Sequence, residues 1–178
     1  MSVTKVAHRY AQALLDLSVE QNNIDKVNAD MVELASICKT SKDFDNLLKS
    51  PIVGTAKKID ILNTIFTTKI EKVSLDFINL IVKNSRADIL PEVAKGFVDL
   101  YKKKNNILDV KVISASPLDS KTKETIIAKI KTSFNGTIEL IEEVDATLLG
   151  GFIVRIDDQQ VDASIASQLA SLKNILLN

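Results

Sequence analysis

The sequence predicts a two-domain α+β protein: an N-terminal six-helix bundle over residues 1–104, then a small mixed domain over residues 105–178 in the order strand, helix, strand, strand, helix. Three observations lead to this prediction. Apolar residues recur at helical spacing through residues 1–104, where Gly54 and Gly96 are the only glycines. After residue 104 the pattern changes to the alternation of a strand. At 178 residues and 46% apolar content, the chain is long enough for one ordinary domain or two small ones.

Six segments of the first domain have apolar residues at intervals of three and four, the pattern of an amphipathic helix. They cover residues 5–20, 24–38, 42–48, 55–66, 71–84 and 89–104. Pro91 falls in the first turn of the last segment, where proline is tolerated because that position has no N–H partner within the helix. Strand signals are almost absent, so we expect this domain to be all-α.

The second domain opens with a strand, because apolar and polar side chains alternate over residues 110–114. A helix follows that begins at Asp119, a residue type that favours helix starts. Its apolar stripe recurs every four residues as far as Phe134. The pair Asn135-Gly136 then ends the helix, since both residue types are frequent just past a helix C-terminus.

Two further strands are expected over residues 137–144 and 152–156, followed by a last helix capped by Asp162. Gly150-Gly151 precede the second of these strands. A phosphate-binding loop requires glycines between a strand and a helix, so that free N–H groups at the helix start face the anion. A strand follows these glycines instead, and we interpret them as relief of backbone strain in a turn.

Charge and composition exclude several classes of function. Lysine plus arginine and aspartate plus glutamate each number 23, so no net basic field attracts nucleic acid. No apolar run exceeds three residues, far short of the roughly 20 that a membrane-spanning helix needs. An amphipathic pattern containing acidic residues begins directly at Met1, in place of a secretory or transit segment, and predicts a protein on the cytosolic side.

The motifs present do not assemble into a catalytic, cofactor or metal site. His8 is the only histidine, which leaves no multi-histidine or cysteine-histidine metal site within one chain. Neighbouring acids in the predicted strands point to opposite faces and cannot act as a pair. The one cysteine, Cys38, lies in an apolar helical pattern and is interpreted as a packed thiol. We therefore expect neither an enzyme nor a bound cofactor.

Two helices carry more apolar surface than a helix facing one core requires. On a helical wheel the apolar residues of the first segment span roughly 200° and those of segment 71–84 roughly 220°, against about 100° for an ordinary surface helix. Complete burial inside the bundle is one explanation. The other is that an amphipathic helix of a second protein binds between the two helices. The pattern alone leaves both explanations open.

Six blocks of sequence occur along the chain in a characteristic order. They are Val6-Ala7-His8-Arg9-Tyr10-Ala11-Gln12-Ala13-Leu14; Leu48-Lys49-Ser50-Pro51; Asn84-Ser85-Arg86 with Leu90-Pro91; Ser114-Ala115-x-Pro117-Leu118; Val144-Asp145-x-x-Leu148-Leu149-Gly150-Gly151-Phe152; and Asp162-x-Ser164. In order and spacing they resemble the ATP synthase delta subunit family, to which the mitochondrial oligomycin-sensitivity-conferring protein also belongs. The resemblance covers essentially the whole chain. Ser85 is a small departure, since Arg or Gly is more usual at that position.

The resemblance implies a non-catalytic stator subunit of the rotary, proton-translocating ATP synthase. It would link the catalytic alpha/beta head to the peripheral stalk so that torque drives ATP synthesis, one copy per complex, at the cytoplasmic face of the bacterial plasma membrane. In the family, the first and fifth helices bind the N-terminal helix of an alpha subunit, and the C-terminal domain binds the C-terminal end of the b subunit. Carried over by position, the residues expected to contact the alpha-subunit helix are Tyr10, Ala13, Leu14, Leu17, Phe77, Leu80, Ile81 and Asn84.

Two other functions remain as alternatives. A helix-binding adaptor of an unrelated complex would use the same apolar arcs, and a charged residue in place of Tyr10 or Leu80 would then leave ATP synthase assembly unchanged. A nucleotide-handling enzyme would be supported by ATP binding that is lost when Gly150 and Gly151 are replaced.

Overall fold

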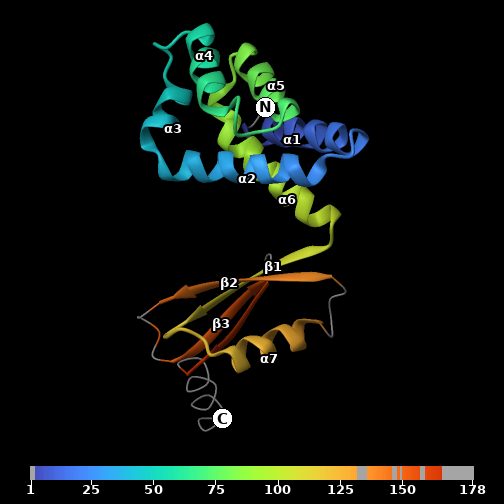
Figure 1. Ribbon diagram of the computed structural model, residues 1–178. Helices are drawn as coiled ribbons and strands as arrows, with labels where there is room; N and C mark the ends of the chain where they lie inside the picture. Colours follow the sequence, from blue (N-terminus) through green and yellow to red (C-terminus); the bar gives the residue numbers. More distant parts are fainter. Residues whose placement is uncertain (1–2, 132–135, 146–147, 149, 157–158, 166–178) are drawn as a thin grey trace. The chain divides into compact units, whose positions relative to one another are not determined.

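Helices joined by short turns make up the first part of the computed structural model, which describes residues 3–131, 136–145, 148, 150–156 and 159–165 (Figure 1). These helices are α1 (Val3–Glu20), α2 (Ile24–Thr40), α3 (Lys42–Lys49), α4 (Thr55–Phe66), α5 (Lys72–Lys83) and α6 (Leu90–Lys104), with a 3-10 turn, η1 (Ala87–Ile89), before α6. The chain divides into two units, which we call unit 1 (Met1–Tyr101) and unit 2 (Lys102–Asn178). The boundary predicted after residue 104 lies at the end of α6, and the limits of the domains stay a prediction.

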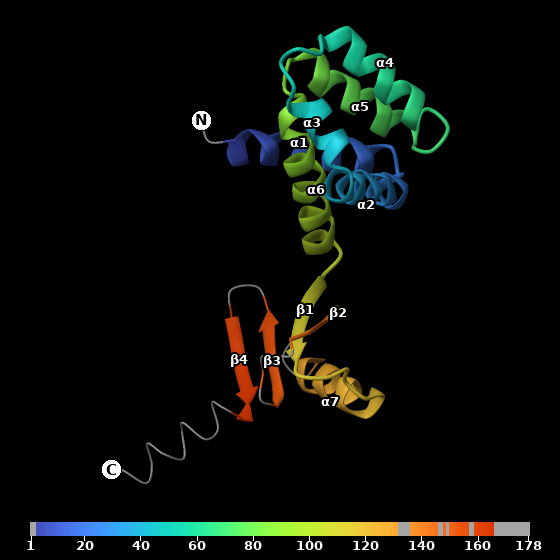
Figure 2. The same cartoon turned by 90° about the vertical axis from the view of Figure 1, so that its left-hand side faces the viewer.

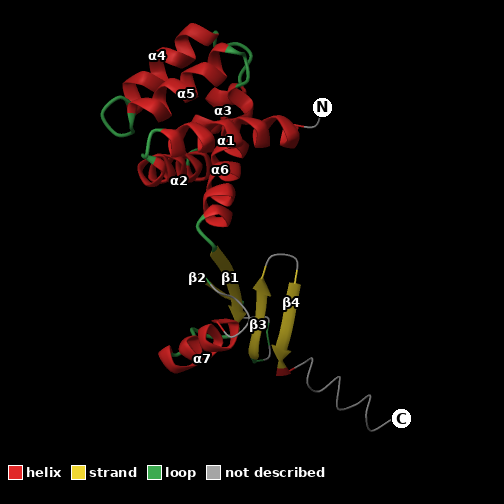
Figure 3. Cartoon of the chain, turned by 90° about the vertical axis from the view of Figure 1, so that its right-hand side faces the viewer, coloured by secondary structure: helices red, strands yellow, loops and turns green. Residues whose placement is uncertain are grey.

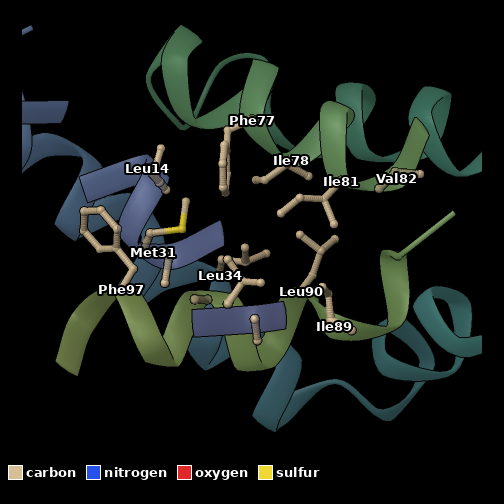
Figure 4. Packing of buried hydrophobic residues seen from close by; sticks show 14 of the residues in the cluster. Leu14, Met31, Leu34, Phe77, Ile78, Ile81, Val82, Ile89, Leu90 and Phe97 are labelled. Atoms are coloured by element: carbon tan, nitrogen blue, oxygen red, sulfur yellow. The ribbon is translucent and has the colours of Figure 1, made fainter. Parts of the chain in front are cut away.

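One hydrophobic core joins the six helices of unit 1. Each helix contributes at least one side chain with less than 2% exposure, and these include Leu14, Met31, Leu48, Phe66, Ile81 and Phe97. Figure 4 shows side chains of α5 pointing from one side into this cluster, with Leu34 and Leu90 opposite them and Leu14 beside Phe77. Burial of each such side chain contributes about 1.5–3 kcal/mol, so the core holds the helix faces in fixed relative positions.

Unit 2 is a four-stranded mixed sheet with one described helix. Its elements are β1 (Ile107–Ser114), α7 (Ser120–Lys131), β2 (Thr137–Val144), β3 (Gly151–Ile156) and β4 (Gln159–Ser164), and the strand order is β2-β1-β3-β4. β1 pairs in parallel with β2 and antiparallel with β3, and β3 pairs antiparallel with β4. Figures 2 and 3 show α7 on one face of the sheet, where Ile126 packs with Val110, Val112 and Val154.

The structure confirms the predicted fold class of a helical region followed by a mixed α+β region. α4 and β2 begin and end at the predicted residues, and the other helices of unit 1 differ from their predicted bounds by two residues or fewer at each end. Asp119 caps α7 as expected, because its carboxylate accepts a hydrogen bond from the backbone N–H of Thr122 at 3.2 Å.

The predicted start of the last helix is wrong. Asp162, expected to cap the last helix, lies in β4, where it is paired with Ile153. The stretch Gln159–Ser164 is a strand because it pairs with β3 along its whole length, although Val161 is its only large apolar residue. The predicted helix beyond residue 165 lies outside the described residues, as does the predicted stripe residue Phe134.

Gly150, just before β3, and Gly151, its first residue, have backbone conformations that other residues rarely adopt. The φ angles are 144° at Gly150 and 79° at Gly151. A Cβ atom added at Gly150 would lie 2.6 Å from Cδ1 of Ile165, too close for a real contact. The turn that leads into β3 therefore requires glycine, in agreement with the interpretation from the sequence.

Candidate partner-binding surface

Tyr10 connects α1 to the end of α5. Its ring packs edge-on against the ring of Phe77, with 6.2 Å between the centroids. Its hydroxyl oxygen accepts hydrogen bonds from Nη1 of Arg86 at 3.0 Å and from Nδ2 of Asn84 at 3.4 Å. The Arg86 guanidinium also lies 5.7 Å from the centre of the tyrosine ring, within the range of a cation–π interaction. The polar and aromatic contacts together fix the orientation of the tyrosine side chain between the two helices.

The end of α5 explains why Arg86 reaches Tyr10. Ser85 has φ 58°, the left-handed conformation that commonly follows a helix. The N–H of Arg86 donates to the carbonyl of Ile81 at 3.1 Å, and the N–H of Ser85 donates to that of Val82 at 2.9 Å. These two bonds form a Schellman motif, which ends the helix and satisfies two of its last carbonyl groups. The Asn-Ser-Arg block therefore makes the turn that places Arg86 beside α1.

The eight residues expected to contact a partner helix fall into two groups. Leu14, Phe77 and Ile81 are 0%, 7% and 0% exposed and belong to the core of unit 1. The other five are reachable from outside, with Tyr10 half-buried, Leu17 37% exposed and Leu80 50% exposed. We call these five the α1/α5 surface, and they are Tyr10, Ala13, Leu17, Leu80 and Asn84. Part of each apolar arc is thus core, and part is accessible in the free chain.

Sequence reasoning did not single out Arg86 as a site residue, although it belongs to one of the recognised blocks. It follows the helix rather than lying within it, so a helical wheel cannot place it. The available signal was the polar run from Asn84 to Arg86 at the end of the fifth helical segment.

A pocket of about 390 Å³ in unit 1 is lined by Lys26, Ala29, Asp30 and residues 67–71. Three of its charged groups, those of Lys26, Asp30 and Glu71, have partners within the protein. The Asp30 carboxylate accepts hydrogen bonds from the N–H of Glu71 at 3.0 Å and from the hydroxyl of Ser74, and the Lys26 ammonium pairs with the Glu71 carboxylate at 2.9 Å. Asp30 thereby caps the start of α5, where the structure records no cap from the helix's own side chains. The geometry indicates a structural carboxylate and no acid–base pair.

The thiol of Cys38 packs partly buried against the core of unit 1. Burial raises the pKa of the Cys38 thiol to about 11, and the carboxylate of Asp45 adds to the effect. Within the described part of the chain, no cluster of three or more histidine, cysteine or acidic side chains could hold a metal ion. None of the described helices combines the length and the apolar content needed to cross a bilayer.

Unit 2 contains its own ion-pair cluster at the end of α6. The ammonium of Lys102 lies 2.7 Å from the carboxylate of Asp109 on β1 and 2.8 Å from that of Glu139 on β2. Burial alone would lower the pKa of Lys102, but these two hydrogen-bonded carboxylates outweigh it and raise the pKa above its ordinary value. The cluster therefore ties the first two strands of the sheet to the last turn of the helix.

Comparison with known proteins assigns a family to this fold. A family model described as ATP synthase delta (OSCP) subunit matches residues 6–176. A relative named ATP synthase subunit delta from Cytophaga hutchinsonii is 35% identical over 174 residues, which are 98% of this chain and 95% of the relative. One of the same name from Clostridioides difficile is 30% identical over 175 residues, with 98% and 97% covered.

A solved structure described as the cryo-EM structure of the Toxoplasma gondii mitochondrial ATP synthase hexamer contains a chain with the same fold. Its TM-score is 0.75 at 24% identity, and 97% of each chain is covered. The family model and the two relatives all span nearly the full length of the sequence. The chain belongs to the ATP synthase delta (OSCP) subunit family.

Proposed function

We propose that this chain is the stator subunit that links the alpha/beta head of a bacterial ATP synthase to the b-subunit stalk. One observation carries the proposal beyond family membership. Leu17 and Leu80 remain 37% and 50% exposed on two helices that are joined through Tyr10. Apolar side chains on adjacent helices, with polar groups beside them, suit the apolar face of an amphipathic helix. The proposed occupant is the N-terminal helix of an alpha subunit.

The buried residues give this surface a rigid base. Leu14 and Phe77 belong to the core and Tyr10 packs against it, so the backbone that carries the exposed side chains is held in place. The hydrogen bonds from Asn84 and Arg86 hold the tyrosine hydroxyl in the same way. A preorganised surface binds a helix more tightly than a mobile one, because less side-chain entropy is lost.

In the proposed role, unit 2 binds the C-terminal end of the b subunit while unit 1 binds the alpha subunit. Two contacts on one chain act in series, and the second becomes effectively intramolecular once the first has formed. This role requires binding strength and no catalytic group, and subunits of this family are structural rather than catalytic. The proposed complex contains one copy of this chain, held peripherally at the cytoplasmic face of the plasma membrane.

Calorimetric titration of the full chain with a peptide from the N-terminus of the same organism's alpha subunit tests this proposal. We expect saturable 1:1 binding with a negative heat-capacity change, the signature of apolar burial. Leu80→Asp should abolish binding, since it places a carboxylate on the α1/α5 surface. Tyr10→Asp should do the same, although the contact of Tyr10 with Phe77 makes it the less conservative change.

Val32→Asp is the matched control, because Val32 is 47% exposed on α2, outside the α1/α5 surface. It should bind like the unmodified chain. Circular dichroism establishes that each variant is folded. If the folded wild-type chain fails to bind, or if Val32→Asp and Leu80→Asp bind equally well, the alpha-subunit contact lies elsewhere. A helix-binding adaptor of another complex would then become the better assignment.

A further inference from the structure

Charges along α1 are separated by sign. Lys5 and Arg9 lie in its first half, Asp16 and Glu20 in its second, and all four side chains are exposed. The helix dipole favours the opposite arrangement, with acids near the N-terminus and cations near the C-terminus. The first turn of α1 contains no acid and its last turn no base. The charge order therefore works against the stability of the helix itself.

These charges border the α1/α5 surface. At 100° per residue, residues three or four apart lie side by side on one helix face. Arg9 is four residues before Ala13, Asp16 is three after Ala13, and Glu20 is three after Leu17. Each of the three side chains thus lies next to a surface residue. The charge along this border changes from positive to negative over 11 residues, about 16 Å of helix.

The end of α5 adds further positive charge to the same end of the surface. Tyr10, in the first half of α1, accepts the hydrogen bond from Arg86, so the cation of Arg86 lies on the Arg9 side. Lys83 is exposed one residue before Asn84, which also contacts Tyr10. The acid of α5, Asp76, lies eight residues before Asn84 and shares its half of the helix with the cation Lys72, so the gradient is carried by α1 together with the C-terminal end of α5.

Lys72 is an exposed cation in the first turn of α5, one turn before Asp76, so this end of α5 carries one charge of each sign. Asp16 accepts a hydrogen bond from the side-chain amide of Gln12 at 2.8 Å, which leaves its charge unneutralised. Among the described residues, the structure records no ion pair for Arg9, Lys83 or Glu20.

We infer that this charge gradient fixes the direction in which the partner helix binds, a statement that rests on the proposed function. The partner helix carries carboxylates at the end that lies over Arg9, Lys83 and Arg86. It carries cations at the end that lies over Asp16 and Glu20. Reversing the helix would leave its apolar contacts similar but would bring like charges together at both ends. Electrostatic complementarity of this kind selects orientation and register more than affinity.

Paramagnetic relaxation measures the direction directly. The alpha-subunit N-terminal peptide carries a nitroxide label at its acid-rich end in one sample and at the other end in a second, and amide signals of the full-length chain are recorded. We expect the first label to broaden the signals of residues 9, 83 and 86, and the second those of residues 16 and 20. The reverse pattern, or equal broadening at both ends, overturns the inference.

Charge reversal gives an independent readout. We expect Arg9→Glu combined with Lys83→Glu to weaken peptide binding about tenfold at low salt, an effect that largely disappears at 1 M salt, where screening is strong. Arg9→Lys with Lys83→Arg should bind normally, and so should Lys57→Glu, a control in the first turn of α4. A peptide in which lysines replace the acidic residues should again bind tightly to the Arg9→Glu, Lys83→Glu variant.

The two proposals fail in different ways. A peptide that binds in the reversed direction, or with an affinity that is indifferent to both charge reversals, contradicts the charge gradient and leaves the proposed alpha-subunit contact standing. A folded wild-type chain that does not bind the peptide contradicts both.

Discussion

Asp30 offers a quantitative test of how α5 is held in place. Its carboxylate is 8% exposed and accepts hydrogen bonds from the Glu71 N–H and the Ser74 hydroxyl, more than 40 residues away. A net hydrogen bond to a charged group contributes about 1.5–3 kcal/mol. Since the two bonds share one oxygen and are not additive, we expect Asp30→Ala to lower the free energy of unfolding by about 2–4 kcal/mol.

For a unit of this size that loss corresponds to a fall in Tm of roughly 10–25 °C. Urea unfolding followed by circular dichroism measures it. Ser74→Ala removes one hydrogen-bond partner and should lower the free energy of unfolding by about 1 kcal/mol. Asp30→Asn keeps the side-chain volume, and its loss of stability should fall between those of Ser74→Ala and Asp30→Ala. In the double variant the losses should not add, because both remove the same bond. A cost below about 0.5 kcal/mol for Asp30→Ala, or full additivity, would refute the capping role.

Three further outcomes are expected. Because burial raises the pKa of Cys38 to about 11, its alkylation by iodoacetamide at pH 8 should be about a hundredfold slower in the folded chain than in urea, and equal rates would contradict this. The raised pKa of Lys102 means that its stabilising contribution is complete below the unfolded value of about 10.4 and is lost as pH rises through the folded value. The difference in free energy of unfolding between wild type and Lys102→Met, measured by urea unfolding, should therefore narrow as pH rises through the folded pKa. A difference that stays constant would show that the ion pairs of Lys102 do not cause it. Ser85→Gly should preserve stability, whereas Ser85→Val should lower it by about 1–2 kcal/mol, because a branched residue is strained at φ 58°; equal stabilities would argue against the Schellman turn.

The helices of unit 1 were predictable because each buries an apolar face. The segment that became α4 lies between the Pro51-to-Gly54 turn and the threonines after Phe66, and both of its ends were found. β4 was missed for the opposite reason. It is an edge strand held by backbone pairing with β3, and Asp162 within it resembles a helix cap when read without that partner.

The candidate surface was predictable only in part. A helical wheel shows how wide an apolar arc is, but the division of that arc between core and exterior depends on the neighbouring helices. Leu14 and Leu17 therefore looked equivalent in the sequence, yet one is buried and the other is 37% exposed. The contribution of Arg86 depends on the left-handed backbone of Ser85, and a serine in the sequence does not predict that conformation.

The position of β1 in the sheet has a mechanical consequence. The chain leaves α6 at Lys104 and enters β1 at Ile107, so a pull transmitted along the backbone reaches this strand first. β1 is paired on both sides, along its whole length with β2 and over residues 110–114 with β3. Traction along the strand loads these hydrogen bonds in shear, all at once, whereas an edge strand pulled sideways would unzip one bond at a time. In the proposed stator role, a load passing from unit 1 to unit 2 would therefore enter the sheet at a strand that is paired on both sides.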